Sequence, residues 1–134
     1  MPVLWTFRCY VAPNGTDEIK DWYDGQSKQV QAKFLSRLKM LAQLPFNEWN
    51  DNLYKDLHGD CVGLGEIRFF AGKIQQRPLG FRSGELEFTI LFCAVEKGEK
   101  FVPKSACQKA LERKKEVEGD TNEECTNALW LALE

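Results

Sequence analysis

The chain has 134 residues, of which 43% are hydrophobic and 28% are charged, and its formal net charge at pH 7 is −2. These proportions are typical of a globular domain with a single core and exclude a disordered chain. The longest strongly apolar run, residues 88–95, is too short to span a bilayer, and no secretion signal is visible. We therefore expect one cytoplasmic domain over residues 1–117 and an acidic, apolar C-terminal tail over residues 118–134.

The charges are unevenly distributed along the chain. Residues 1–117 carry 18 basic side chains against 15 acidic ones, whereas the last 17 residues carry five acidic side chains and no basic one. Residues 63–115 alone hold 11 basic and six acidic side chains. A basic surface of this kind suits a polyanion, because neutralised phosphates release counterions. A solvated surface of mixed charge explains the same numbers equally well.

Five cysteines are scattered along the chain: Cys9, Cys61, Cys93, Cys107 and Cys125. Their number is odd, none forms a C-x-x-C pair, and His58 is the single histidine, so a zinc site has too few ligands. We expect five reduced thiols, as is usual in the cytosol, and no bound metal.

The N-terminal third predicts a strand followed by two helices. Residues 4–12 are rich in aromatic and β-branched side chains, which favour a strand. Thr16 and Ser27 can each cap a helix. The second helix carries an apolar stripe at spacings of three and four residues: Val30, Phe34, Leu38 and Leu41. Pro45 ends it, so residues 16–44 are expected to form an α-helical hairpin with one face to bury.

The sequence of residues 64–117 predicts three strands and one helix. Residues 64–71 alternate in polarity and lead through a glycine turn into residues 74–81, which favours a β-hairpin. Residues 88–95 are almost wholly apolar, as expected of a central strand covered on both faces. A last helix is expected from Pro103 to Val117. The expected fold class is therefore α+β in the order β-α-α-β-β-β-α, with two layers, about four strands and the helical hairpin on one face.

Several short motifs follow one another in the second half of the chain: KDLHG (55–59), GEIRF (65–69), RPLGF (77–81), FTIL (88–91), VEKG (95–98), and Pro103 followed by Ala106, Ala110 and Arg113. Together and in this order they resemble the RelE/HigB-type toxins of type II toxin–antitoxin systems, in particular the phage-derived, HigB-like branch of the RelE/ParE superfamily. With the preceding strand and hairpin, the resemblance covers residues 4–117.

This resemblance implies a toxin that cuts messenger RNA on the translating ribosome without a metal or other cofactor. The ribose 2′-hydroxyl attacks the adjacent phosphate, so the site needs a proton acceptor, cations and an acid. A relative with the same fold inhibits DNA gyrase instead, and an inactive member would serve only as an interaction module. The implied partners are a cognate antitoxin of the helix-turn-helix type and mRNA on the ribosome, with no membrane. A homodimer through the apolar tail is a further option.

The resemblance also implies the catalytic residues. Arg77 falls on the strand arginine that faces the scissile phosphate, where a guanidinium can bond two oxygens at once. Arg68 would hold phosphate and Glu66 would accept a proton. The plain alternative for these two residues is a cross-strand ion pair that contributes little to stability. Lys97 falls on a basic turn that meets the RNA. The plain alternative for Arg77 is a surface ion pair with Glu66 or Glu87. If Arg77 faces the phosphate, we expect Arg77→Ala to remove toxicity and to leave the melting temperature nearly unchanged.

Three further residues are candidates for RNA binding: Lys55, Lys100 and His58. Solvated lysines and a turn-stabilising histidine are the plain alternatives. Several nucleases of the group carry a tyrosine or histidine near the C-terminal end as an acid or a stacking platform, but neither type follows His58 in this chain. This departure keeps action by binding open as an alternative to cleavage.

Overall fold

The computed structural model describes residues 3–119, which form an α+β fold with three α-helices and one mixed sheet of seven strands. The elements follow in the order β1 (Thr6–Cys9), α1 (Glu18–Asp24), α2 (Lys28–Ala42), the short 3-10 helix η1 (Phe46–Glu48), β2 (Tyr54–Asp56), the 3-10 helix η2 (Gly59–Cys61), β3 (Gly65–Ile67), β4 (Phe69–Ala71), β5 (Ile74–Gly84), β6 (Glu87–Lys97), β7 (Lys100–Val102) and α3 (Ala106–Glu118).

Local signals account for the helical hairpin. The Asp17 side chain accepts a hydrogen bond from the Lys20 backbone N–H at 2.9 Å, so Asp17 rather than the expected Thr16 caps α1. Ser27 caps α2 as predicted, by accepting from the Val30 N–H at 3.2 Å. The predicted apolar stripe of α2 is buried along its whole length. The helix ends at Ala42, ahead of the proline.

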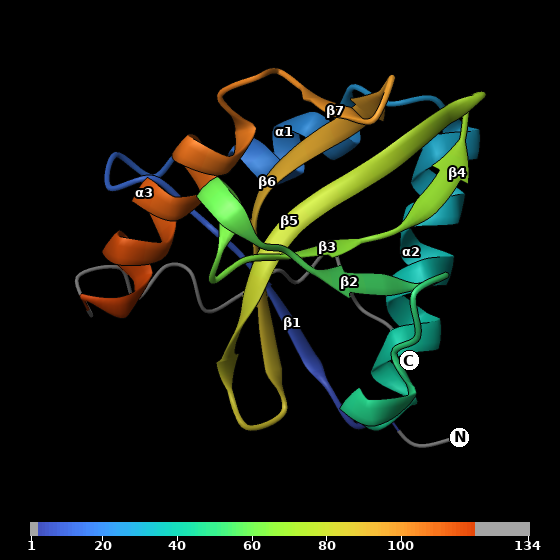
Figure 1. Ribbon diagram of the computed structural model, residues 1–134, viewed down its shortest axis with the longest axis horizontal. Coiled ribbons are helices and arrows are strands. Elements are labelled where there is room, and N and C mark those ends of the chain that lie inside the picture. The colour runs from blue at the N-terminus through green and yellow to red at the C-terminus, as the bar shows by residue number, and fades with distance from the viewer. Residues whose placement is uncertain (1–2, 120–134) are drawn as a thin grey trace.

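The long strands β5 and β6 form the centre of the sheet, whose main path is β1-β6-β5-β3-β2 (Figure 1). β1 runs parallel to β6, and the other pairs are antiparallel. The predicted count of about four strands is wrong. The Arg68 N–H bonds to the Leu53 carbonyl at 2.8 Å and separates β3 from β4, while β2 and β7 are three-residue strands, too short for a clear alternating pattern.

Both faces of the sheet are covered, so the fold has three layers where two were expected. The helical hairpin packs on one face, as predicted, against an aromatic cluster that includes Trp49 and Phe88. The helix α3 packs on the other face, where Ala106 and Ala110 meet Leu79 and other apolar residues. Figure 1 shows α2 and α3 at opposite sides of the strands. The central strand β6 contributes to both clusters, as its uniformly apolar sequence predicts.

A disulfide between Cys61 and Cys107 ties the η2 loop to the first turn of α3, with the two Cα atoms 5.3 Å apart. Cys9 and Cys93 remain thiols. The prediction of five reduced thiols is therefore wrong. The paired cysteines are 46 residues apart, and only the packing of α3 onto the sheet brings them together.

Within residues 3–119, no helix has the length and apolar composition needed to cross a membrane. Apart from its first two residues, the expected tail 118–134 lies outside the described residues, and so does the expected homodimer contact through it.

Candidate functional site

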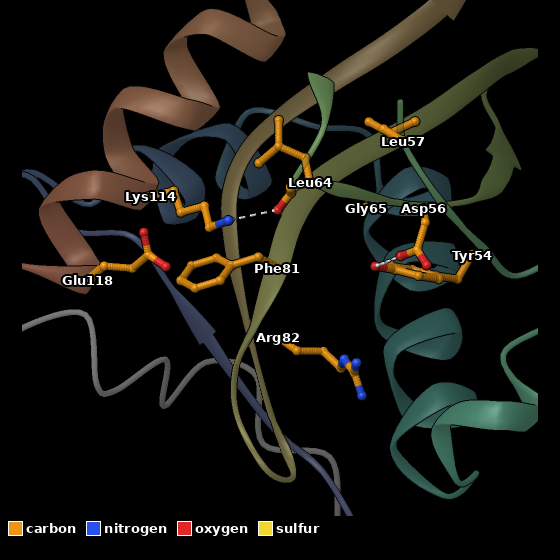
Figure 2. Close-up of a pocket in the computed structure, with 10 residues that line it drawn as sticks. Tyr54, Asp56, Leu57, Leu64, Gly65, Phe81, Arg82, Lys114 and Glu118 are labelled. Atoms are coloured by element: carbon orange, nitrogen blue, oxygen red, sulfur yellow. Dashed lines mark hydrogen bonds between the residues drawn. The ribbon is translucent and has the colours of Figure 1, made fainter. Parts of the chain in front are cut away.

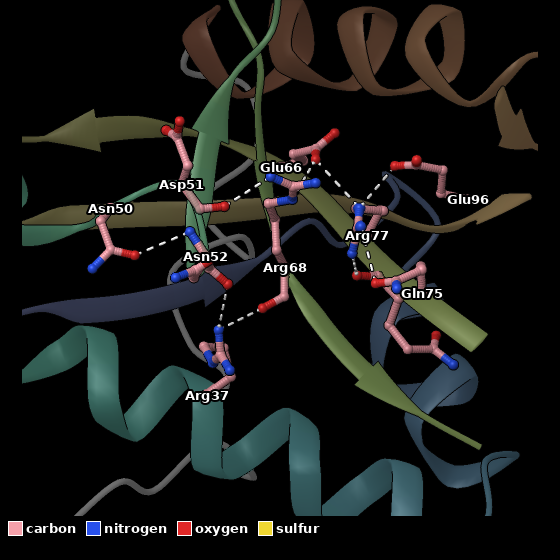
Figure 3. A network of polar contacts seen from close by, with 10 residues as sticks. Arg37, Asn50, Asp51, Asn52, Glu66, Arg68, Gln75, Arg77 and Glu96 are labelled. Atoms are coloured by element: carbon pink, nitrogen blue, oxygen red, sulfur yellow. Dashed lines mark hydrogen bonds and ion pairs between the residues drawn. The ribbon is translucent and has the colours of Figure 1, made fainter. Parts of the chain in front are cut away.

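An ion-pair network joins three of the predicted catalytic residues. One carboxylate oxygen of Glu66, on β3, lies 3.0 Å from Nε of Arg68 and 3.3 Å from Nε of Arg77. Nε of Arg77 also lies 3.0 Å from a carboxylate oxygen of Glu96 on β6 (Figure 3). The register pairs Glu66 with Leu79, a residue of the cluster under α3, so the network lies on the α3 face of the sheet.

Arg77 occupies the inner end of this network and is only 3% exposed. Besides the two carboxylates, it donates from Nη1 to the Gln76 carbonyl at 2.9 Å and from Nη2 to the Gln75 side chain at 3.1 Å. Each guanidinium nitrogen therefore has a partner within the protein. The plain alternative for Arg77 is correct in the pairing with Glu66 but wrong in the surface position, and the second carboxylate partner is Glu96, not Glu87.

Glu66 is 4% exposed, and burial raises the pKa of its carboxyl. The guanidinium groups of Arg77 and Arg68 oppose this shift, and the nearby Glu96 adds to it. A carboxylate with a raised pKa holds a proton more firmly than an ordinary glutamate. Glu66 is therefore a stronger base than an ordinary glutamate, which is the direction of shift that general-base catalysis requires.

Arg68 occupies the outer end of the network, and its side chain is 27% exposed. Its Nη1 donates to the Asp51 carbonyl at 2.7 Å, and its own carbonyl accepts from Nη1 of Arg37 at 2.6 Å. Beside it lies a cavity of about 270 Å³, lined by Arg37, Asp51, Asn52, Arg68, Phe69, Phe70 and Gln75. Arg68 is thus the arginine of the network that a phosphate from solution can reach.

The other predicted residues lie around the network or away from it. Lys55 is exposed on β2, directly opposite Glu66 in the register. Lys97 and Lys100 face each other, exposed, at the β6–β7 turn. Strand alternation directs Lys97 to the face opposite Glu96, so Lys97 does not join the network.

His58 is exposed and precedes η2, the short helix that carries Cys61. Within residues 3–119, no hydrogen bond or ion pair links its imidazole to the network. The structure thus groups Lys55 with the ion pairs and leaves His58 apart.

A second cavity, of about 310 Å³, lies between β2, β5 and the C-terminal end of α3 and contains none of the predicted site residues (Figure 2). The Tyr54 hydroxyl donates to Asp56 at 3.0 Å, and burial raises its pKa. Lys114 donates to the Gly63 carbonyl at 3.1 Å. Arg82 and Lys114 are balanced there by Asp56 and Glu118, so the cavity offers no excess positive charge to a phosphate.

Sequence reasoning missed Glu96, Gln75, Phe70 and Arg37. A weak signal existed for two of them, because Glu96 and Phe70 lie within or beside the VEKG and GEIRF motifs. In the described part of the chain, no group of three or more His, Cys, Asp or Glu side chains could hold a metal ion.

No family model matches the chain, and no curated protein or solved structure matches it either.

Proposed function

We propose that this protein is the toxin of a type II toxin–antitoxin system, of the RelE/HigB type, and that it cuts messenger RNA on the translating ribosome. The observation that carries the proposal is the meeting of Glu66, Arg68 and Arg77 in one network. These residues come from the GEIRF and RPLGF motifs, which are two of the landmarks of the resemblance. An α+β fold with the hairpin on one sheet face also agrees with it.

In the proposed reaction, Arg68 binds the scissile phosphate and balances the charge that develops on it. Glu66 accepts the proton of the ribose 2′-hydroxyl as the 2′-oxygen bonds to phosphorus. The bond from phosphorus to the 5′-oxygen then breaks, and this oxygen takes a proton from solvent. The products are a 2′,3′-cyclic phosphate and a 5′-hydroxyl. Because Glu66 is 4% exposed, Arg68 must turn toward the phosphate to uncover it.

Arg77 acts in this scheme as a positioning residue. It holds Glu66 between two guanidinium groups and is itself held by Glu96 and Gln75. The exposed lysines of the neighbouring strands, Lys55, Lys97 and Lys100, are proposed to contact the RNA backbone, and His58 is a weaker candidate for the same role. Such a toxin would act in the cytoplasm, where reducing conditions would keep Cys61 and Cys107 as thiols. Its helix-turn-helix antitoxin would cover the Arg68 surface with an acidic segment.

The test is cleavage of mRNA on programmed ribosomes, with the RNA 5′-ends mapped. We expect Arg68→Ala and Glu66→Gln each to lose on the order of 100- to 1000-fold in rate. Arg82→Ala removes an exposed arginine outside the network and is the matched control, with a change of a few-fold at most. If the wild-type protein leaves mRNA intact on ribosomes, the nuclease proposal is wrong.

The burial of Arg77 favours a second candidate, a toxin that acts by binding DNA gyrase or another target. A guanidinium that is 3% exposed and has a protein partner at each nitrogen is poorly accessible to a phosphate from solution. A gyrase supercoiling assay beside the ribosome assay separates the two proposals. Toxic protein that cuts no RNA but stops supercoiling supports the second.

A further inference from the structure

Phe70 is the only exposed residue among the nine phenylalanines, all of which are described, and its side chain is 55% exposed. Its neighbours on β4 are Phe69 and Ala71, which are 4% and 2% exposed and pack toward the helical hairpin. Because side chains alternate along a strand, Phe70 points to the other face, where the ion-pair network lies. The apolar ring of Phe70 is therefore exposed to solvent next to the proposed catalytic residues.

The ring of Phe70 is part of a cavity wall. It lines the cavity of about 270 Å³ together with Arg68, Asn52 and Gln75. The register pairs Phe70 directly with Gln75, so the ring and the amide are cross-strand neighbours. Ligand pockets for drug-sized molecules usually exceed about 300 Å³. This cavity is therefore of a size for one ring system.

The polar groups of this cavity suit a nucleotide better than a simple anion. Arg68 uses Nε for Glu66 and Nη1 for the Asp51 carbonyl, and no hydrogen bond joins its Nη2 to another described residue. Asp51 also lines the cavity, and its negative charge offsets part of the positive charge of the arginines. A base needs both donors and acceptors at its edge, and the amides of Asn52 and Gln75 supply both.

We propose that this cavity is a stacking subsite for one unpaired nucleotide of single-stranded RNA beside the scissile bond. The base stacks on Phe70, its edge is bonded by Gln75 and Asn52, and Arg68 holds the adjoining phosphate. The inference rests on the proposed nuclease function and deepens it. It gives the chain an aromatic platform on β4 in place of a C-terminal tyrosine or histidine, neither of which follows His58.

The test combines changes in the protein with changes in the RNA. Single-turnover cleavage is measured with the full-length protein on ribosomes programmed with mRNA that carries one abasic nucleotide at each position flanking the cut. Stacking of a base on an aromatic ring contributes about 1–3 kcal/mol, so Phe70→Ala should weaken the apparent affinity about 5- to 150-fold. Removal of the stacked base from the RNA should weaken the apparent affinity of the wild type by a similar factor. The same RNA should bind the Phe70→Ala variant almost as well as intact RNA does.

Two further variants separate stacking from other effects. Phe70→Trp should keep the wild-type affinity, because indole stacks at least as well as phenyl, whereas Phe70→Leu should resemble Phe70→Ala. Leu86→Ala changes another exposed apolar side chain, 49% exposed at the β5–β6 turn, and should have no effect. Circular dichroism checks that each variant is folded.

Different experimental results would contradict the subsite and the nuclease proposal. If the wild type cuts RNA but Phe70→Ala has the same affinity and the same sensitivity to abasic positions, the subsite is wrong and the nuclease proposal stands. Phe70→Leu with wild-type affinity would also overturn stacking. A wild type that cuts no RNA would overturn both.

Discussion

The two faces of the sheet are built from different chemistry. The face under α1 and α2 is closed by aromatic rings, with Trp49 within 4.6 to 6.1 Å of five other ring centroids. The face under α3 combines apolar contacts with a disulfide and with a buried arginine between two carboxylates. Burial of ions costs desolvation energy that an apolar core would avoid. The aromatic face therefore serves stability, and the ionic face is where a function for the buried charges is expected.

The largest effect should follow a change in the aromatic face. Phe34 is fully buried on α2, with its ring centroid 5.2 Å from that of Trp22 and 6.0 Å from that of Phe69. Phe34→Ala should lower the free energy of unfolding by about 4 kcal/mol, measured by urea denaturation. Met40→Ala, at a 46% exposed position on the same helix, should stay within about 0.5 kcal/mol. Loss of RNA cleavage in folded Phe34→Ala protein would contradict a purely structural role for this face.

The disulfide on the opposite face should have the next largest effect. Replacement of Cys61 and Cys107 together by serine should cost about 3 kcal/mol, because the unfolded chain loses its constraint. Wild-type protein with a reductant should match this double variant. Alkylation of denatured, unreduced protein should label Cys9 and Cys93 and leave Cys61 and Cys107 unlabelled. Labelling of all four would show that the pair is not formed in the isolated protein.

Residue patterns along the chain predict those elements of the fold that depend on interactions between neighbouring residues. The stripe of α2, the cap at Ser27 and the hairpin of β4 and β5 all follow from spacing and turn residues. The short strands β2 and β7 and the Cys61–Cys107 pair depend on contacts between distant segments. No pattern within a few residues encodes such contacts.

The candidate site, like the fold, could be predicted from the sequence only in part. Glu66, Arg68 and Arg77 could be grouped because their motifs lie on strands that a hairpin must bring together. The burial of Arg77 was not predictable, because it depends on Glu96, which is 19 residues away and whose position follows from the β5–β6 register. Alternation indicates the same face for Phe70 as for Glu66 and Arg68, but the cavity beside Phe70 was not predictable, because Asn52 and Gln75 come from other segments.

The ionic network gives the third prediction. Arg77→Met should cost about 3 kcal/mol, because it leaves Glu66 and Glu96 without their shared cation in a buried site. Arg68→Met should cost less than about 1 kcal/mol, since Arg68 is partly exposed and Arg77 still pairs with Glu66. Urea denaturation at neutral pH measures both. The value for Arg77 replaces the expectation that its loss hardly affects stability. Equal losses of unfolding free energy in the two variants would contradict the assignment of Arg77 to the buried end of the network and Arg68 to the exposed end.

The smallest effect concerns the pH dependence of stability. Burial raises the pKa of Glu66 above its ordinary value of 4.5, so the folded state keeps this proton to a higher pH than the unfolded state does. Below 4.5 the carboxyl is protonated in both states, and its contribution to stability is fully present. As the pH rises from 4.5 through the folded pKa, the unfolded state has already released the proton and this contribution is lost.

Glu66→Gln isolates this contribution, because an amide of similar shape does not titrate. Other carboxyls act equally in both proteins, so the difference in free energy of unfolding between wild type and Glu66→Gln should fall with rising pH and then become constant. Urea denaturation at a series of pH values from 4 to 8 measures it. Cleavage on ribosomes should follow the opposite trend, because a general base works only once it is ionised. If the difference in free energy of unfolding rises with pH instead, the two arginines lower the pKa of Glu66 more than burial raises it. Glu66 would then be a poor proton acceptor.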